Sequence, residues 1–354
     1  MTQLGIVGTN YGRTVHLPAF RMDRRCTVVA LAGSAEARTR ELARGAGVAK
    51  GYGNWRVLVE DDEVEAVAIA TMPALQAQIA CAALALGKPV FCEKPMASTL
   101  ANARTMLDAA QRAGKPVMID FNFSQIMAWL RAKQMLDENA IGRLRHVAVN
   151  WQVENRAIQL RMRNWKTLTD DGGGVLGNFV SHCFHYLEWF CGPIANLTAR
   201  LTGLPDDSGL QTTAAMALEF QSGPLASLSM SCASFLGSGH RLEFYGEDGT
   251  LVLHNRQLGP TADYMRGFEL YHGKRGADAL VRIEVTDPAD AGQPDGRIAP
   301  VSRLATRFLD AIEGKGNAQP DFAAGYRVQQ LIDAAQRSQR DGKMIATLPK
   351  DLQA

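Results

Sequence analysis

The chain has 354 residues, which is long for a single core and comfortable for two domains. Apolar residues make up 46% and charged residues 21%, so the composition is that of an ordinary globular protein and excludes a disordered one. The chain has 38 basic and 36 acidic side chains, so its formal net charge is only +2. The chain as a whole therefore offers no electrostatic surface for nucleic acid or for an anionic membrane.

The N-terminus and the cysteines predict a cytoplasmic protein. The opening MTQLGIVGT lacks the basic segment of a signal peptide, and no apolar run approaches the ~20 residues of a membrane span. The six cysteines are scattered without C-x-x-C spacing. We therefore expect buried free thiols in a reducing compartment, with neither a disulfide framework nor a zinc site. These thiols belong to Cys26, Cys81, Cys92, Cys183, Cys191 and Cys232.

The first 120 residues alternate between two periodicities. Apolar runs of strand length occur at 4–7, 28–32, 64–70, 90–92 and 116–119, and alanine-rich helical stretches separate them. Strands that are apolar on both faces and alternate with helices predict a parallel sheet covered on both sides, the doubly wound Rossmann fold. We assign it to residues 1–122. Within it, Ser98 is the expected N-cap of the last helix, which Gly114 should end.

The turn after the first strand reads GTNYGRTVHLPAF. A dinucleotide fingerprint has glycines at 8, 10 and 13, whereas this chain has Gly8, Asn10 and Arg13, with an extra Gly12. Asparagine tolerates positive φ, so Asn10 is expected to form the tight turn. We predict that backbone N–H groups here hold the pyrophosphate of a cofactor; an ordinary strand-to-helix turn is the alternative. The predicted cofactor residues are Gly8, Thr9, Asn10, Tyr11 and Gly12.

The end of the second strand, VALAGSAEAR, bears on which cofactor is used. It lacks the acidic residue that would bind the ribose 2′-hydroxyl of NAD and offers Ser34 and Arg38 instead. That pair suits a 2′-phosphate, so the sequence favours NADP over NAD. The alternative is that Arg38 faces solvent on its helix.

The stretch VFCEKPM places Glu93, Lys94 and Pro95 directly after an apolar run. Ligands of doubly wound sheets lie outside the carboxyl ends of the strands, so we expect Lys94 beside the nicotinamide. Hydride transfer to or from an alcohol carbon also requires transfer of the hydroxyl proton, which a lysine can accept or give. On these residues alone, a solvated loop with a surface ion pair is an equal alternative.

Four segments make the sequence similar to a known family. FCEKPMA, AIATMP, GTNYGRTVHLPAF and GGGVLGNFVSH resemble the glucose-fructose oxidoreductase, inositol dehydrogenase and rhizopine-catabolism (Gfo/Idh/MocA) family, and the likeness extends over essentially the whole chain. The resemblance implies an NAD(P)-dependent oxidoreductase of sugars, polyols or sugar nucleotides. It implies that Lys94 contacts the reacting hydroxyl and that its bond to Pro95 is cis. It also implies cofactor contacts from Ala70, Thr71, Pro73, Glu93 and Lys94.

The second half, residues 123–354, has a different pattern. ASLSMSC alternates apolar residues with serines, as in a sheet that has one packed and one polar face. RLEFYGEDGTLVL is typical of a β-hairpin that turns at 247–249. We predict an open, mostly antiparallel sheet with helices on one face and a C-terminal helix, which binds substrate. The family resemblance implies a homodimer or homotetramer formed through this sheet.

The segment DGGGVLGNFVSHCFHYLEWF carries the second chemical signal. Asn178, His182 and His185 have spacings of four and three, which places them on one helix face. His182 matches the family's histidine and is our second catalytic candidate, as proton donor or acceptor to substrate; a satisfied core histidine is the alternative. His185 is expected in the core. A zinc site of His182, His185 and Cys183 is discounted, because Cys183 points off the shared face, so no metal is predicted.

Asn178 stands where the family has aspartate, and Val180 where it commonly has glycine. Asparagine carries no charge and offers donors as well as an acceptor. We hypothesise a changed hydrogen-bonding arrangement for substrate, with a carbonyl or anionic group near Asn178. The alternative is drift toward a non-catalytic binder.

The segment ENRAIQLRMRNWK precedes the glycine run and is rich in basic residues. Arg156, Arg161, Arg163 and Lys166 could hold the diphosphate of a sugar nucleotide or an acidic substrate through charge-assisted hydrogen bonds. The alternative is a solvated loop. Arg163 and Trp165 join Asn178, His182 and Lys94 as predicted substrate residues.

Two functions therefore remain. The first is an NADP-preferring oxidoreductase that interconverts a secondary alcohol and a ketone on a small carbohydrate-like substrate, with Lys94 and His182 as catalytic residues. The second is a regulatory protein that keeps the dinucleotide fold and senses NAD(P) or another ligand without turnover.

Overall fold

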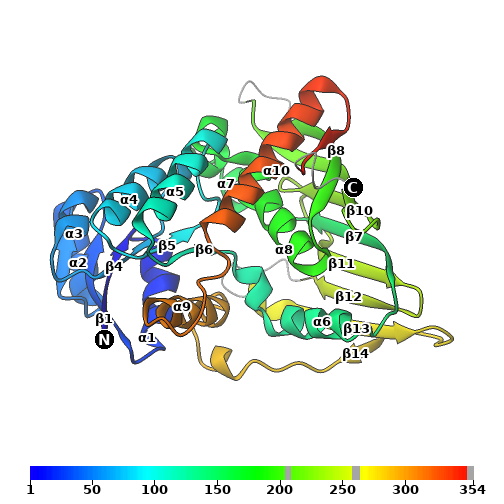
Figure 1. The fold of residues 1–354 in the computed structure, drawn as a ribbon, viewed down its shortest axis with the longest axis horizontal. Helices are drawn as coiled ribbons and strands as arrows, with labels where there is room; N and C mark the ends of the chain where they lie inside the picture. The colour runs from blue at the N-terminus through cyan, green and yellow to red at the C-terminus, as the bar shows by residue number, and fades with distance from the viewer. Residues whose placement is uncertain (204–208, 257–263, 349–354) are drawn as a thin grey trace. The chain divides into compact units, whose positions relative to one another are not determined.

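The computed structural model describes residues 1–203, 209–256 and 264–348 (Figure 1). Its contacts divide the chain into two compact units. The first comprises Met1–Asn122 and Gly292–Gln329, and the second Phe123–Ala291 and Gln330–Ala354. The sequence-based division at 122/123 thus assigned 292–329 to the second domain, whereas these residues pack with the first.

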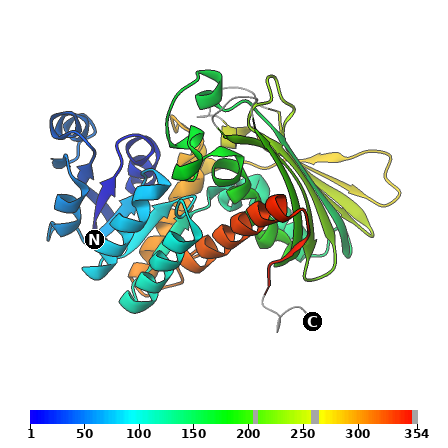
Figure 2. The same ribbon diagram turned by 90° about the horizontal axis from the view of Figure 1, so that it is seen from above.

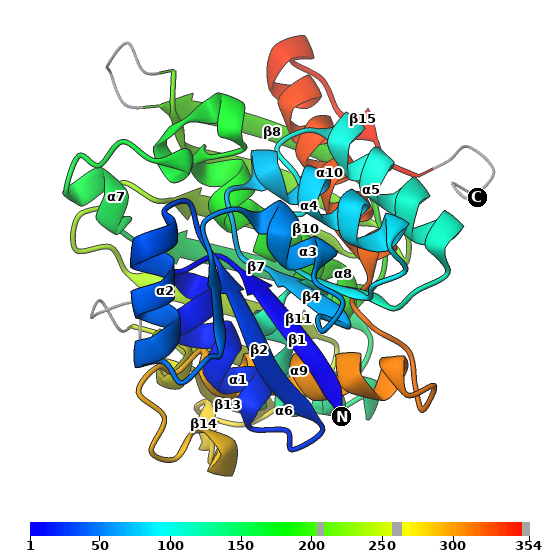
Figure 3. The same cartoon turned by 90° about the vertical axis from the view of Figure 1, so that its left-hand side faces the viewer.

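The first unit contains a parallel six-stranded sheet, as predicted. Its strand order, β3-β2-β1-β4-β5-β6, is that of the Rossmann fold. Figure 3 shows β2, β1 and β4 side by side. All five predicted strands are present, and the short β3, which has no long apolar run, is the one that the sequence did not indicate. The strands are β1 (Thr2–Val7), β2 (Cys26–Ala32), β3 (Lys50–Tyr52), β4 (Ala66–Ile69), β5 (Val90–Glu93) and β6 (Val117–Asp120).

Helices belong to the same unit as this sheet; most of them connect its strands, and α9 and the start of α10 come from later in the chain. They are η1 (Gly12–His16), α1 (Leu17–Arg21), α2 (Glu36–Gly45), α3 (Trp55–Glu60), α4 (Pro73–Ala85), α5 (Leu100–Ala113), α9 (Ile298–Ile312) and the start of α10 (Phe322–Asp341). Helix α5 ends as predicted at Gly114, whose φ is +60°. Its N-cap differs from the prediction: Thr99, not Ser98, accepts a hydrogen bond from the N–H of Asn102.

The core of the first unit joins residues that are far apart in the sequence. Phe20 of α1, Phe91 of β5 and Phe308 of α9 are fully buried and meet edge to face, with ring centroids 5.2–6.3 Å apart. The apolar face of α9 therefore completes the core that β1 to β6 leave open on this side.

The second unit contains a nine-stranded sheet in the order β14-β13-β12-β11-β7-β10-β9-β8-β15. All neighbouring strands are antiparallel except β7 and β10, so the predicted open, mostly antiparallel sheet is confirmed. The predicted hairpin is β11–β12. The strands are β7 (Leu144–Gln152), β8 (Ile194–Gly203), β9 (Gln211–Phe220), β10 (Leu225–Ser231), β11 (Gly239–Gly246), β12 (Gly249–Asn255), β13 (Glu269–Lys274), β14 (Val281–Ile283) and β15 (Ile345–Ala346).

Helices α6 (Met127–Asp137) and α8 (Ser181–Cys191) lie against one face of this sheet (Figure 2). Trp129 of α6 contacts Tyr186 and Phe190 of α8 and His240 of β11 through its ring. The opposite face of β10 carries exposed serines, as its alternating sequence predicted. Short helical segments connect these elements: η2 (Asn122–Gln125), α7 (Arg156–Gln159), η3 (Trp165–Thr167), η4 (Thr169–Asp171), η5 (Leu176–Val180), η6 (Tyr264–Gly267) and η7 (Pro288–Asp290).

The end of α10 is tied to β8 by side chains. Ser338 Oγ accepts a hydrogen bond from the N–H of Ala199 at 2.9 Å, and Gln339 Oε1 accepts one from the N–H of Leu201 at the same distance. Among the described residues, no helix has both the length and the apolar character needed to cross a membrane.

Candidate active site

Gly8 directly follows β1 and has no space for a side chain. Its φ is +124°, and a Cβ there would lie 2.2 Å from the carbonyl oxygen of Ala70, just beyond β4. At Gly12, a Cβ would lie 2.8 Å from Cγ2 of Ile6, so this glycine allows the following helix to approach β1. These are two of the functions that glycines have in a dinucleotide fingerprint: the tight turn and close helix–strand packing. The turn after β1 therefore excludes side chains at both glycine positions.

Asn10 does not have the conformation that we expected. The described non-glycine residues with positive φ are Asn139, Arg161 and Leu236, so the left-handed conformation in this turn belongs to Gly8. The carbonyl of Asn10 instead accepts hydrogen bonds from the N–H groups of Arg13 and Thr14 and starts a π-helical turn, η1. Thr9 and Tyr11 flank it.

Ser34 and Arg38 are both exposed beyond the end of β2. Arg38 lies in the first turn of α2, where the exposed Glu36 forms an ion pair with Arg40 instead. Gly33 packs tightly, since a Cβ there would lie 2.5 Å from Oγ1 of Thr39. Because Ser34 and Arg38 are exposed, a ribose phosphate can reach both side chains, and so can water.

Gln76 fixes the loop that carries Glu93, Lys94 and Pro95. This fully buried side chain lies in the first turn of α4. Its Nε2 lies 3.0 Å from the carbonyl oxygen of Glu93, 2.7 Å from that of Pro95 and 3.3 Å from that of Met96. The Lys94–Pro95 bond is cis, as the family resemblance implied. The backbone that places Lys94, itself half-buried, is thus held in one conformation.

The same glutamine links this loop to the other predicted cofactor residues at the end of β4. Ala70 donates its N–H to the carbonyl of Val7 at 2.8 Å, and Pro73 begins α4 only three residues before Gln76. Ala70, Thr71 and Pro73 therefore lie between the Gly8 turn and the Lys94 loop. All predicted cofactor residues of β1, β4 and β5 lie at the carboxyl edge of one sheet.

A buried histidine joins two carboxylates beneath this loop. His16 Nε2 lies 3.3 Å from Oε1 of Glu93 and 3.2 Å from Oδ2 of Asp120, and His16 and Asp120 are fully buried. Burial lowers the pKa of His16, but the hydrogen bonds that its ring makes to Asp120 and Glu93, together with their charges, outweigh burial and raise the pKa to about 9. Burial and the charge of Glu93 raise the pKa of Asp120 to about 7. We call His16, Glu93 and Asp120 the histidine–carboxylate cluster.

Tyr11 closes one side of this cluster. Its ring meets that of His16 edge to face at 5.2 Å, and its hydroxyl accepts a hydrogen bond from Nδ2 of Asn122 at 3.1 Å. The guanidinium of Arg297 lies 5.1 Å from the Tyr11 ring centroid and is paired with Asp295. Burial, then the charges of Asp120 and Glu93, raise the pKa of Tyr11 well above its usual value, so its hydroxyl stays neutral.

In the second unit, the glycine run allows close backbone packing. Gly172 and Gly174 have positive φ, and a Cβ on Gly173 would lie 2.1 Å from the carbonyl oxygen of Trp165. The chain then enters the π-helical turn η5 and continues as α8. Asn178 lies in η5 and His182 in the first turn of α8, and they are only 8% and 6% exposed.

His182 packs among aromatic rings. Its ring centroid lies 4.6 Å from that of Phe123 and 6.5 Å from that of Trp151. His185 is partly buried, and desolvation lowers its pKa, which agrees with the packing function that we expected of it. Cys183 Sγ accepts a hydrogen bond from Tyr186, and among the described residues these histidines and Cys183 do not bring their ligand atoms together as a metal site would.

His240 was not indicated by the sequence. It is fully buried and stacks on Trp151, with centroids 4.0 Å apart and planes 2° apart. Its Nε2 lies 3.1 Å from the hydroxyl of Tyr186 and its Nδ1 2.9 Å from that of Tyr264. Burial holds the pKa of His240 well below its usual value, so the neutral ring can donate to one hydroxyl and accept from the other. In the sequence, this histidine looks like any polar residue of a strand.

The basic residues before the glycine run are exposed. Arg156, Arg161, Arg163 and Lys166 all lie on the surface, on α7 and η3 or the turn between them. Lys166 Nζ lies 5.9 Å from the ring centroid of Trp165, which is half-buried.

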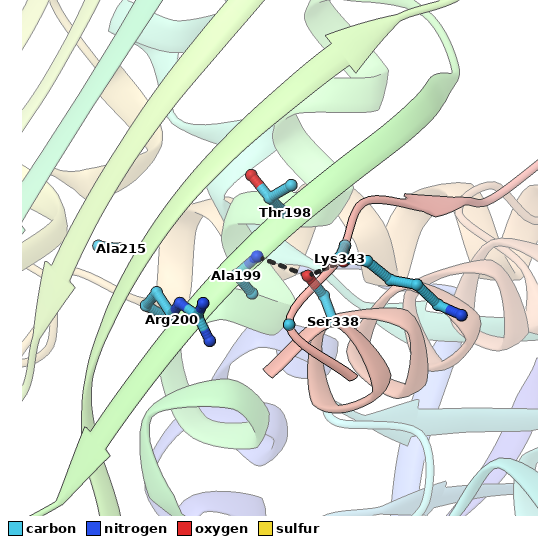
Figure 4. Close-up of a pocket in the computed structure, with 7 residues that line it drawn as sticks. Thr198, Ala199, Arg200, Ala215, Ser338 and Lys343 are labelled. Atoms are coloured by element: carbon cyan, nitrogen blue, oxygen red, sulfur yellow. Dashed lines mark hydrogen bonds between the residues drawn. The ribbon is translucent and has the colours of Figure 1, made fainter. Parts of the chain in front are cut away.

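A hollow of ≈ 190 Å³ lies where β8, β9 and the end of α10 meet (Figure 4). Ser338 lines this hollow. Its hydroxyl accepts a hydrogen bond from the N–H of Ala199 and donates one to the carbonyl oxygen of Lys343 at 2.8 Å. None of the predicted site residues lines it. The lining residues are Thr198, Ala199, Arg200, Ala215, Ser338, Gly342 and Lys343.

Comparison with known proteins identifies the family. The profile of the oxidoreductase family with an NAD-binding Rossmann fold matches residues 2–121, and that of the GFO/IDH/MocA C-terminal domain matches residues 129–252. The chain belongs to the GFO/IDH/MocA family. It is an oxidoreductase with an NAD-binding Rossmann domain, and the family membership favours the enzyme over the regulatory alternative.

Individual relatives cover nearly the whole chain. An uncharacterized oxidoreductase of Synechocystis is 31% identical, covering 97% of this chain and 95% of its own. Levoglucosan dehydrogenase of Pseudarthrobacter phenanthrenivorans is 27% identical over 83% of each chain. Among solved structures, levoglucosan dehydrogenase in complex with NADH and levoglucosan has a TM-score of 0.88 at 22% identity, covering 98% of this chain and 100% of its own. This last likeness supports the fold.

The structure therefore groups the predicted residues in two places. The Gly8 turn, the 70–73 segment, Glu93 and Lys94 lie together in the first unit, and Asn178 and His182 lie together in the second. Gln76, His16 and Asp120 were missed. The signals for the last two were a histidine inside the quoted glycine turn and an aspartate at the end of an apolar strand.

Proposed function

We propose that this chain interconverts a secondary alcohol and a ketone on a sugar or polyol. The observation that carries the proposal is Lys94, held by a fixed backbone at the carboxyl end of β5 beside the Gly8 turn. The bound nicotinamide supplies or accepts the hydride. The myo-inositol 2-dehydrogenase of Thermotoga maritima, 24% identical over 72% of this chain, and levoglucosan dehydrogenase support a polyol or sugar substrate.

Lys94 and His182 have separate functions in this proposal. The Lys94 amine takes the hydroxyl proton in oxidation and returns it in reduction. His182, buried in an aromatic surround, donates a hydrogen bond to a substrate oxygen. Asn178, one helical turn earlier, offers the substrate both an amide donor and a carbonyl acceptor, where aspartate would offer acceptors alone.

The absorbance of reduced nicotinamide tests the proposal. The substrates are levoglucosan, myo-inositol, aldoses, sugar acids and sugar nucleotides, each tried with NAD and NADP. The Lys94→Ala enzyme should lose at least about 100-fold in kcat, because positioned proton transfer contributes 10²–10⁴-fold. Lys115→Ala, an exposed lysine of the same unit, is the matched control. Equal turnover by the Lys94→Ala enzyme would refute the role of Lys94.

A non-catalytic sensor predicts a different result. Its reduced cofactor would bind tightly, with no turnover on any member of the panel, in both the wild type and the Asn178→Asp variant. If Asn178→Asp instead raised turnover on ordinary sugars with no loss on the best substrate, the proposed function of the asparagine amide would be wrong.

We further propose that the cofactor is NADP rather than NAD, because Ser34 and Arg38 are exposed where the 2′-phosphate would lie. Titration of cofactor fluorescence tests this preference. Arg38→Ala should weaken NADPH binding about tenfold and leave NADH binding unchanged, in line with loss of one charge-assisted contact. Arg40→Ala, which changes an arginine two residues further along α2, is the control. Equal affinity of the wild type for both cofactors would refute the preference.

The basic loop is proposed to hold an acidic or phosphorylated substrate through Arg163 beside Trp165. Arg163→Glu should raise the KM for such a substrate and leave the KM for an uncharged sugar unchanged. Arg24→Glu, an exposed arginine of the other unit, is the control. An unchanged KM for every charged substrate would refute this function of the loop.

We also propose a cytoplasmic homodimer or homotetramer formed through the exposed face of the nine-stranded sheet. Ala217 of β9 is exposed on that face, opposite Ser227 of the neighbouring strand β10. Ala217→Arg should lower the mass measured by light scattering, whereas Ala37→Arg on the exposed side of α2 should not. A monomeric wild type would refute the assembly.

A further inference from the structure

Two members of the histidine–carboxylate cluster, His16 and Asp120, have no function assigned so far in cofactor or substrate binding. Glu93 and Asp120 are paired residues at the ends of neighbouring parallel strands, so their carboxylates lie side by side. Two buried carboxylates cannot both be ionised at low cost without a nearby cation. His16, at hydrogen-bonding distance from both, is that cation. A buried charge network of this kind needs a physical explanation.

Glu93 connects the cluster to Lys94. One carboxylate oxygen, Oε1, faces His16, and the other, Oε2, accepts a hydrogen bond from the N–H of Lys94 at 3.1 Å. Burial raises the pKa of Glu93, but hydrogen bonds with His16 and Asp120 and the charge of His16 lower it by more. The charge of Lys94 also lowers it. Because electrostatic interaction is mutual, the charge of the cluster acts on the Lys94 ammonium in return.

We propose that His16 and Asp120 are positioning residues for Lys94: they hold the Glu93 carboxylate in place, and the summed charge of the cluster sets how readily Lys94 gives up its proton. The proposal rests on the catalytic function proposed for Lys94. It assigns to two residues outside the Glu93–Lys94–Pro95 segment an effect on the proton-transfer step.

The net charge of the cluster changes near neutral pH. With His16 charged, Glu93 ionised and Asp120 protonated, the sum is zero; once Asp120 loses its proton, the sum is minus one. The raised pKa of Asp120, about 7, places this change near neutrality, while His16 stays charged to about 9. Above pH 7, the extra negative charge stabilises the Lys94 ammonium.

The other groups around the cluster do not cancel this change. Tyr11 stays neutral, and so does Cys92, because burial followed by the charges of Glu93 and Asp120 raises its thiol pKa well above the usual value. Arg297 is paired with Asp295 through two hydrogen bonds at 2.9 and 2.5 Å. Asp120 is therefore the group whose proton changes the net charge beneath Lys94 near pH 7.

The test measures the Lys94 amine directly and needs no substrate. Lysines of the full chain are reductively methylated with ¹³C-formaldehyde, and the Lys94 signal is identified by its loss in Lys94→Arg. In the wild type, its chemical shift should show a first inflection near pH 7, from Asp120, before the amine itself titrates. Asp120→Asn should remove this inflection and lower the Lys94 pKa by about 0.5 unit or more, the size expected for one nearby charge.

Asp61→Asn is the matched control. Asp61 is a largely buried aspartate of the same unit that binds Lys50 and Tyr52, so this variant loses an ion pair without changing the cluster. It should leave the Lys94 titration unchanged. If Asp120→Asn fails to fold, the presence or absence of the inflection near pH 7 in the wild-type Lys94 signal still tests the proposal. A single wild-type titration step, or an equal shift in both variants, would overturn the proposal.

The kinetic measurement separates this proposal from the proposed function. With a substrate in hand, the pH limb of kcat that reports Lys94 should move in Asp120→Asn by the shift seen in the ¹³C titration. A merely structural effect would lower kcat at every pH without moving the limb. If the Lys94 titration shifts and the limb does not move, the electrostatic coupling stands but Lys94 is not the group that sets the rate.

Discussion

Single residues in the first unit show how little space the Gly8 turn leaves for side chains. At Gly8, both the backbone conformation and the space are unsuitable for a side chain, because φ is +124° and the Ala70 carbonyl oxygen occupies the position of a Cβ. Gly45, at the end of α2, contrasts with it: nothing lies within 4 Å of its added Cβ, and its φ is not in the left-handed range. The two positions make a matched pair.

We expect Gly8→Ala to lower the free energy of unfolding by more than about 3 kcal/mol and to abolish NADH binding, because the new Cβ must displace backbone that lines the turn. Gly45→Ala should instead stabilise the chain by about 0.5–1 kcal/mol, since alanine is the better helix residue and restricts the unfolded chain. Urea unfolding and NADH fluorescence measure both. Full cofactor affinity in Gly8→Ala would contradict the assignment of this turn.

In the second unit, the hydroxyl of Tyr186 has two buried partners. It donates to Cys183 Sγ at 3.0 Å and lies 3.1 Å from His240 Nε2. Tyr186→Phe leaves that imidazole nitrogen without its partner in the core, which should cost about 1–3 kcal/mol in urea unfolding. Tyr245→Phe on the exposed face of β11 should cost little. An equal loss in the two variants would show that the Tyr186–His240 contact adds nothing.

At the scale of elements, the start of helix α5 shows which of two adjacent residues is its N-cap. Ser98 and Thr99 are adjacent hydroxyl residues, and both are common N-caps. Only the Thr99 side chain accepts the Asn102 N–H in the structure, because the chain enters the helix one residue later than its pattern suggested.

Thr99→Ala should therefore destabilise the chain by about 1 kcal/mol, whereas Ser98→Ala should change stability by less than about 0.5 kcal/mol. The readout is the shift of the thermal unfolding midpoint of the two variants, measured side by side. Thr99→Ser, which keeps the capping oxygen, should recover most of the loss. Should Ser98→Ala prove the more harmful change, the helix begins one residue earlier than described.

The sequence predicts elements well where periodicity alone determines them. The long apolar strands β1, β2, β4, β5 and β6 and the β11–β12 hairpin follow from local pattern. The three-residue β3 has no such pattern and forms because β2 offers an edge to pair with. The histidine–carboxylate cluster could not be predicted either, because His16, Glu93 and Asp120 come together only through the strand order.

At the scale of the whole molecule, the chain returns to its first unit late in the sequence. Ile298, Val301, Leu304, Phe308 and Leu309 of α9 are fully buried with residues of α1 and the parallel sheet. Nothing in the amphipathic pattern of α9 tells which core it covers, so the sequence placed it with the second domain. In addition, Ile119 of β6 donates its N–H to the carbonyl of Pro320 at 2.8 Å.

This topology makes residues 1–122 incomplete as a folding unit. Burying a large aliphatic or aromatic side chain contributes about 1.5–3 kcal/mol, so the five side chains of α9 contribute roughly 8–15 kcal/mol as an upper estimate, comparable to the whole stability of a domain.

We expect a fragment of residues 1–122 to show no cooperative thermal unfolding and no NADH binding. The same fragment joined through a flexible glycine–serine linker to residues 292–329 should recover both. Phe308→Asp in the joined chain should abolish the recovery, because it places a charge in that core. Cooperative unfolding and NADH binding by residues 1–122 alone would show that the parallel sheet does not depend on α9.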